Sequence, residues 1–203
     1  MPPLNSYQLR CAIRNEFARA GIVPGTSVRT AVRAAADPDA FRWILTTEQP
    51  ATVFDWDRWD FVSEVLLIDG MNVPSIKQVP LLDSHSRSTV DDVLGSVNDF
   101  QQTRAGGFIA LDGSVNFAAD EKSQRTSQKV LDGHITDGSV GYHVSNAVWI
   151  PEGMEAAVKV RMFTGPLKVS YASELREFSI TPIGADTLAK VRSLCAGLVG
   201  RLA

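Results

Sequence analysis

Short stretches of alternating or continuous apolar residues follow one another along most of this chain. Gly, Asn, Asp or Pro separates most of them, which is typical of strands joined by turns. Asp112-Gly113, between two such stretches, is the strongest hairpin signal. Short strands at such even spacing favour an antiparallel sheet that curls into a barrel. We expect strands at residues 41–45, 61–68, 79–82, 93–97, 108–111, 115–118, 139–144, 147–150, 157–163, 169–171 and 177–181.

Other segments place apolar residues at helical spacing. Residues 1–40, rich in Arg and Ala, predict a helical appendage with helices at 6–20 and 28–36, a possible propeptide or arm. Residues 121–131 predict a polar helix that ends at Asp132-Gly133. Residues 186–202 predict a C-terminal helix that packs on the barrel or docks to a scaffold or a second subunit. The expected fold class is therefore mainly β with flanking helices (α+β), the β domain spanning 41–203.

Composition narrows the choice of function. The chain has 203 residues and a formal net charge of −3, which gives no electrostatic footprint for nucleic acid or an anionic membrane. Trp56 and Trp59 stand among acidic residues and are expected to pack on the outside of the barrel rather than to stack on bases. No segment has the apolar length of a signal peptide or a membrane-spanning helix. Cys11 and Cys195 lack a CxxC partner and are expected to be free thiols, so we expect an intracellular protein.

Three segments carry residues that could perform chemistry. His85 follows a predicted strand and stands beside Asp83 and Ser84, where a general base could face a cleft or could simply be solvated. A metal site built from these acids is a weaker interpretation, because no Cys or second His is nearby. No glycine-rich phosphate loop occurs either. We therefore expect no cofactor and no metal.

The second segment surrounds Ser139. Gly138 and Gly141 bracket this serine, so a substrate carbonyl could approach the backbone and backbone N–H groups could face an oxyanion. The oxyanion donors stay open, since an arginine such as Arg176 is also possible. From this pattern alone, Ser139 could equally be a turn serine that enters a strand.

The third segment contains Glu177 in the middle of a predicted strand. A buried carboxylate needs a cationic or hydrogen-bonding partner, and an imidazole is suitable because the carboxylate fixes its tautomer. A solvent-facing glutamate or an ion pair with an arginine is the alternative. His85, Ser139 and Glu177 make a serine hydrolase possible, because a serine needs a base and the base needs an orienting group.

The three segments together, LLDSHSRSTVDDVLGSV, GHITDGSVGYHV and LREFSITPIGADTLAKVR, resemble the HK97-type phage prohead (capsid maturation) serine proteases. The resemblance runs from Phe41 to Arg192 and implies that His85 is the general base, Ser139 the nucleophile and Glu177 the third member of the triad. It also implies relation to the herpesvirus assembly proteases, and hence a β-barrel. Those relatives use a second histidine, for which His143 and His134 are the candidates. We discount His143 because it lies about 13 Å along one strand from Ser139, and His134 because it lies in a loop.

The resemblance further implies a serine endopeptidase of a bacteriophage that acts during virion assembly. Its expected location is the host cytoplasm, inside the assembling prohead. Its expected partners are the major capsid protein precursor, scaffold segments and further copies of itself in a homo-oligomer, with no nucleic acid and no membrane. Autoproteolysis is a further expectation. Two alternatives stay open: a non-catalytic capsid-assembly or scaffolding module that keeps the barrel, and an unrelated hydrolase of small esters.

Overall fold

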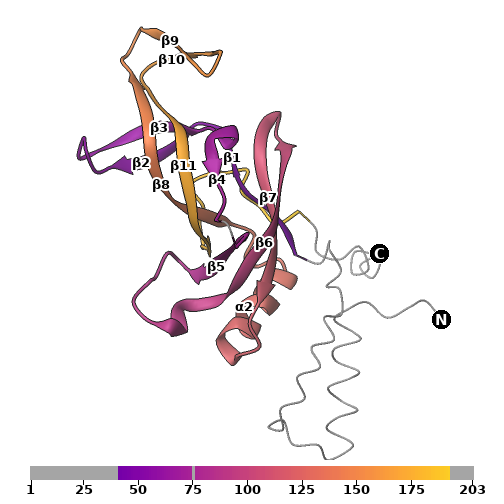
Figure 1. Ribbon diagram of the computed structural model, residues 1–203. Helices are drawn as coiled ribbons and strands as arrows, with labels where there is room; N and C mark the ends of the chain where they lie inside the picture. The colour runs from indigo at the N-terminus through magenta and orange to yellow at the C-terminus, as the bar shows by residue number, and fades with distance from the viewer. Residues whose placement is uncertain (1–40, 75, 193–203) are drawn as a thin grey trace, which may run out of the picture. The chain divides into compact units, whose positions relative to one another are not determined.

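The computed structural model describes residues 41–74 and 76–192. The prediction of a mainly β fold is confirmed within this part, which contains one α-helix and two 3₁₀ turns (Figure 1). The strands are β1 (Arg42–Thr47), β2 (Ala51–Asp55), β3 (Asp60–Leu66), β4 (Met71–Asn72), β5 (Gln78–Asp83), β6 (Val93–Ala105), β7 (Phe108–Phe117), β8 (Gly138–Ile150), β9 (Glu155–Val158), β10 (Arg161–Thr164) and β11 (Leu167–Ile180). The helical elements are η1 (Ile68–Gly70), η2 (Val90–Asp92) and α2 (Glu121–Leu131).

The main sheet is mixed rather than wholly antiparallel. Its strand order is β1-β7-β6-β5-β11-β3-β2, and β11 also pairs with β8 and β4. β11 runs parallel to β3, β4 and β5 and antiparallel to β8. The predicted antiparallel pattern is wrong on this point, because alternation along one strand does not reveal the direction of the strand that pairs with it. Figure 1 shows β8 and β11 side by side, running up to the β9–β10 hairpin.

No continuous strand ladder closes the sheet into a barrel within the described residues. Residues 189–192 instead connect β1 to the residues just before β8 by single bridges, Trp43 to Val191 and Asp137 to Lys190. The Ile44 N–H donates to the Lys190 carbonyl at 2.9 Å, and the Gly138 N–H donates to the Ala189 carbonyl at 3.3 Å. This segment therefore lies between β1 and the start of β8.

The helix predicted at residues 186–202 is wrong for residues 186–192, the part of it that the structure describes. Residues 186–192 form a turn and bridges, not a helix. Asp186 explains the turn, because its carboxylate accepts hydrogen bonds from the N–H groups of Leu188 at 2.9 Å and Thr47 at 2.6 Å. The rest of that predicted helix, the appendage at 1–40 and both cysteines lie outside the described residues.

Asp112-Gly113 is not a hairpin turn, which corrects a second prediction. Both residues lie inside the continuous strand β7, and the turn to β6 is made at Gly106-Gly107. The Asp112 side chain is buried and forms ion pairs with Arg42 and with Arg192, the latter at 2.9 Å. These partners come from distant parts of the chain, so the local Asp-Gly signal could not reveal them.

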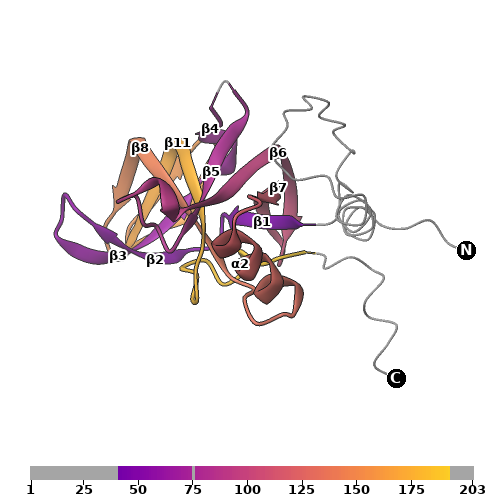
Figure 2. The ribbon, with the colours of Figure 1, turned by 90° about the horizontal axis from the view of Figure 1, so that it is seen from below.

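The polar helix α2 is confirmed with the predicted bounds. The Asp120 side chain caps its first turn by accepting from the Ser123 N–H at 3.0 Å, and Gly133 follows its end in a left-handed conformation. Only a narrow face is buried, and Val130 on that face joins the main core. Figures 1 and 2 both show α2 at the ends of β6 and β7. No helix among the described residues has the length and apolar character needed to cross a membrane.

The main core lies between the sheet's inner faces. Its fully buried side chains include Trp43, Leu45, Leu175 and Phe178. The rings of Trp43 and Phe178 meet edge to face with centroids 5.7 Å apart. Phe178 belongs to the stretch of β11 that contains Glu177, so packing of this core fixes the position of the candidate site.

Candidate active site

Ser139 and Glu177 lie on the same face of the β8–β11 ladder. Ser139 is paired with Ser179, and Gly141 is paired with Glu177. The intervening residue Phe178 points into the core. Since side chains alternate along a strand, Ser139, Gly141, Glu177 and Ser179 face away from the core. The fold thus brings two of the predicted site residues to neighbouring strands.

A β-bulge at Arg176 gives Glu177 this orientation. The ladder register moves from Leu175 opposite Tyr142 to Glu177 opposite Gly141, which leaves Arg176 as the extra residue. Leu175 and Phe178 are both fully buried, three positions apart. Without the extra residue, strict alternation from Leu175 would turn Glu177 into the core and Phe178 out of it.

His85 reaches the same face from the end of β5. β5 runs beside the end of β11, with Leu82 paired to Ser179 and Asp83 to Ile180. The chain then turns through Ser84 and His85, which adopt left-handed φ angles of 50° and 61°. Such angles are unfavourable for residues with a side chain and persist where neighbouring contacts hold them. Here the Ser84 N–H donates to the Ile180 carbonyl at 3.0 Å, and the His85 N–H donates to Ser179 Oγ at 3.0 Å.

The structure joins His85 directly to Glu177. His85 Nδ1 lies 2.6 Å from Glu177 Oε1, while the Ser179 hydroxyl donates to Oε2 at 2.8 Å. Arg87 Nη2 lies 3.4 Å from Oε1. The Glu177 side chain is only 2% exposed, whereas that of His85 is 41% exposed. An ionised carboxylate can only accept hydrogen bonds, so in a neutral imidazole this contact would put the proton on Nδ1 and leave a lone pair on Nε2. This is the protonation pattern of a general base.

Two glycines make this packing possible. A Cβ added to Gly141 would lie 2.1 Å from Glu177 Oε1, and one added to Gly138 would lie 2.1 Å from Phe178 Cζ. Contacts this short cannot form, so a side chain at either position would displace its neighbour. The sequence suggested that Gly138 and Gly141 leave space for a substrate carbonyl. In the structure, Phe178 occupies the space at Gly138 and the Glu177 carboxylate occupies the space at Gly141.

Ser139 is the nucleophile candidate with access to solvent. It lies two residues from Gly141 along β8, roughly 7 Å from the position opposite Glu177. Its side chain makes no hydrogen bond within residues 41–74 and 76–192, to His85 or to any other group. The neighbouring Ser179 is fully buried and already donates to Glu177. Of the two serines, only Ser139 is therefore partly open to solvent.

The other histidines are separate from this cluster. His134 is exposed in the turn that follows α2. His143 is exposed, paired with Glu174 on the β8–β11 ladder. Over the described part of the chain, neither histidine is hydrogen-bonded to His85, and no group of three His, Cys, Asp or Glu side chains could hold a metal ion.

A cleft of about 910 Å³ lies beside the His85–Glu177 pair. Its lining includes Leu82, Arg87, His143, Arg176 and Glu177. Ser139 lines a different and much smaller cavity of about 80 Å³, together with Val140 and Glu64. Of the three candidate residues, Glu177 therefore lines the large cleft and Ser139 lines the small cavity.

Ser179 and Arg87 are site residues that sequence reasoning missed. The Glu-x-Ser spacing of Glu177 and Ser179 places both on one strand face, which was the available signal for Ser179. Arg87 gave no such signal, because its contact with Glu177 spans 90 positions in the chain. The Arg176 bulge is likewise visible only in the ladder register.

In comparisons with known proteins, no family model, no curated protein and no solved structure matches the chain.

Proposed function

We propose that this protein is a serine endopeptidase that uses Ser139 as nucleophile, His85 as general base and Glu177 as the residue that orients the base. The observation that carries the proposal is the 2.6 Å contact between His85 Nδ1 and a buried Glu177, on the sheet face that Ser139 shares. A carboxylate, an imidazole and an accessible serine on one rigid face are the parts that acyl transfer needs.

The proposed reaction proceeds in two halves. Ser139 Oγ attacks the scissile carbonyl while His85 Nε2 takes its proton, and Glu177 stabilises the resulting imidazolium. His85 then gives this proton to the leaving amine, which departs and leaves an acyl-enzyme. Water, deprotonated by His85, releases the acyl group and restores Ser139.

The biological setting of the proposal comes from the three sequence segments that resemble phage prohead proteases. In that setting the substrates are the capsid protein precursor, its scaffold segments and the enzyme itself, cleaved inside the assembling particle. The proposal includes a barrel of the herpesvirus-protease type. The bridges of residues 189–192 to β1 and to residues 136–138 support it, because they join the two regions of sheet that a barrel would close.

A non-catalytic capsid-assembly module is the second candidate. The observation in its favour is that, within the described residues, no hydrogen bond joins Ser139 to His85. Catalytic hydrogen bonds often form fully only when substrate is bound, so this observation is compatible with an enzyme as well.

The test is co-expression with the capsid precursor of the same phage, comparing wild type with Ser139→Ala by intact mass. Trimmed capsid chains with the wild type alone would support the endopeptidase and give the cleavage site. Equal masses in assembled particles would favour the assembly module.

A second measurement is independent of the substrate. A fluorophosphonate probe forms an O–P bond with an activated serine and releases fluoride. We expect it to modify Ser139 in the wild-type protein and nothing in Ser139→Ala. Modification at Ser179, which would persist in Ser139→Ala, would overturn the assignment of the nucleophile.

A further inference from the structure

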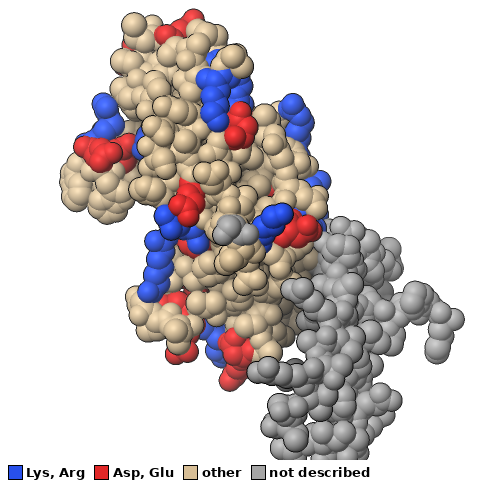
Figure 3. Space-filling model, in the orientation of Figure 1, with Lys and Arg blue, Asp and Glu red and all other residues tan. Residues whose placement is uncertain are grey.

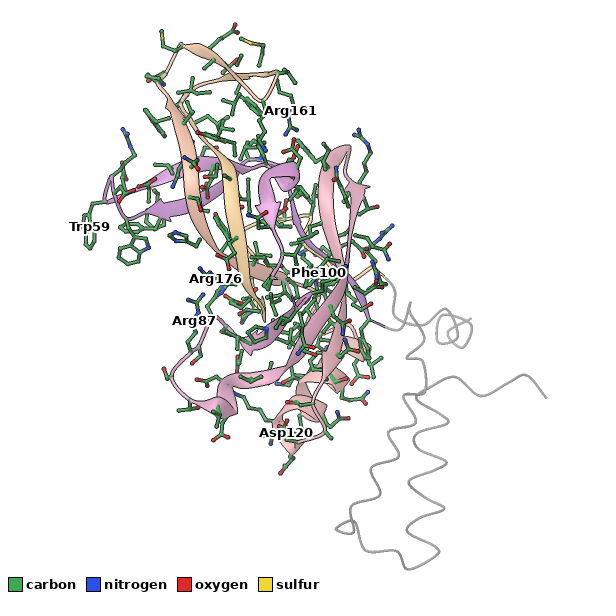
Figure 4. All side chains as sticks on the ribbon, viewed as in Figure 1. Trp59, Arg87, Phe100, Asp120, Arg161 and Arg176 are labelled. Carbon is green, nitrogen blue, oxygen red and sulfur yellow. The ribbon has the colours of Figure 1, made fainter. Side chains whose placement is uncertain are left out.

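Two arginines face the cleft that Glu177 lines. Arg87 and Arg176 both line the 910 Å³ cleft, and their side chains are 62% and 54% exposed. Figure 4 labels them one above the other on the same side of the molecule, and Figure 3 shows blue basic side chains gathered there. The cleft therefore carries two cationic groups that solvent or a ligand can reach.

The two side chains come from different elements. Arg176 is the bulged residue of β11, which turns its side chain outward next to Glu177. Arg87 follows His85 by two positions in the loop between β5 and β6. A ligand that contacts both would consequently bridge the base-bearing loop and the strand that carries Glu177.

Neither arginine is fully used by its acidic neighbour. Arg176 pairs with Glu174 at 2.8 Å, and Arg87 contacts Glu177 at 3.4 Å. A guanidinium has several N–H donors in a planar fork, so one acidic contact leaves further donors free to bind another carboxylate. Glu177 also lines the cleft, but it is only 2% exposed and already accepts hydrogen bonds from His85 and Ser179.

The remaining walls of the cleft are partly apolar. Pro80, Leu82, Val90 and Val93 line it, and Val90 is 86% exposed. Apolar walls with cationic groups suit a side chain that has an aliphatic stem and a carboxylate head. Glu and Asp are the residues with that chemistry.

We propose that this cleft is a substrate subsite in which Arg87 and Arg176 bind the carboxylate of an acidic residue close to the scissile bond. The inference rests on the proposed function and adds the substrate class to it: peptide segments with Glu or Asp near the cleavage point.

The first experiment digests a random-sequence peptide library with the full-length protein and identifies the cleaved bonds by mass spectrometry. We expect Glu and Asp to be enriched at one position near the cut. The favoured peptide is then compared with its matched Glu-to-Gln peptide, and we expect kcat/KM to fall about tenfold or more, since a hydrogen-bonded charge pair is lost. Most of the change should lie in KM and should shrink at high salt.

Variants of Arg176 test whether this side chain binds the acidic residue of the substrate, because a change of preference between matched peptides cannot come from a loss of folding. Arg176→Gln should remove the preference between the Glu and Gln peptides, Arg176→Lys should keep part of it, and Arg176→Glu should favour a matched Lys peptide. Cleavage without acidic enrichment, or a preference unchanged in Arg176→Gln and Arg176→Glu, would overturn this inference alone. A library left intact by the wild-type protein would overturn the proposed function and, with it, this inference.

Discussion

Replacing Glu177 by glutamine tests the catalytic assignment most directly. The two side chains have nearly the same shape, so the substitution removes a charge without opening a cavity. Glu177 accepts hydrogen bonds from the Ser179 hydroxyl at 2.8 Å and from His85 Nδ1 at 2.6 Å. A glutamine keeps one acceptor oxygen and replaces the other with an NH₂ donor.

The expected damage is to the histidine tautomer. If the glutamine oxygen accepts from Ser179, its NH₂ group faces His85 Nδ1, and Nδ1 must then become the acceptor. The proton moves to Nε2, which can no longer take a proton from Ser139. We expect the rate of fluorophosphonate modification to fall about 10³- to 10⁴-fold, as for loss of an orienting carboxylate elsewhere. That corresponds to about 4 to 5.5 kcal/mol of transition-state stabilisation.

The matched control is Glu64→Gln. Glu64 is 4% exposed against 2% for Glu177, and it also accepts hydrogen bonds from hydroxyl groups, those of Tyr142 and Ser170. Both substitutions should lower the free energy of unfolding by about 1 to 3 kcal/mol, the value of a hydrogen bond to a charged group. Only Glu177→Gln should slow the modification of Ser139. Urea unfolding measures the first quantity and intact mass against time the second. Wild-type rates in Glu177→Gln, or equal loss in Glu64→Gln, would refute the reasoning.

Three further predictions concern packing and charge. Gly141→Ala should slow modification of Ser139 about 10²-fold, because its Cβ would displace the Glu177 carboxylate. In the control Gly133→Ala the added Cβ meets open space, so this variant should lose stability but keep the rate of modification. Equal rates of modification in the two variants would contradict this prediction. Burial and the neighbouring Glu64 raise the pKa of the Tyr142 phenol above its ordinary 10.0. The free energy of unfolding of the wild type, measured in urea, should therefore fall above about pH 10. The difference in that free energy between the wild type and Tyr142→Phe should shrink over the same pH range. Lys168→Met should cost about 3 kcal/mol, because it leaves the buried Asp55 and Glu64 without their cation. The Lys168 hydrogen bond lowers the pKa of Asp55 below 3.8. The stabilisation by this ion pair should therefore be present at neutral pH and be lost in the wild type as pH falls below about 3.8. An acid unfolding transition that is unchanged in Lys168→Met would argue against this prediction.

Local patterns in the sequence determined the mainly β fold and the helix at 121–131. Alternation and turn residues report which segments become strands, and a capping Asp120 with a glycine after the last turn reports where a helix begins and ends. The same patterns offered His85, Ser139 and Glu177 as candidates, and the resemblance of three segments gave them roles. The structure joins His85 to Glu177 and places Ser139 on the same face. Whether Ser139 is the nucleophile stays a prediction.

The tertiary structure alone decided how these elements combine. Parallel pairing of β11, the burial of Asp112 and the bridges of residues 189–192 all depend on contacts between residues far apart in the chain. The bulge at Arg176 also belongs here, because it exists only in the register between β8 and β11. Periodicity along one segment contains no information about its partner strand, so the sequence left open whether an imidazole, an arginine or solvent meets the Glu177 carboxylate.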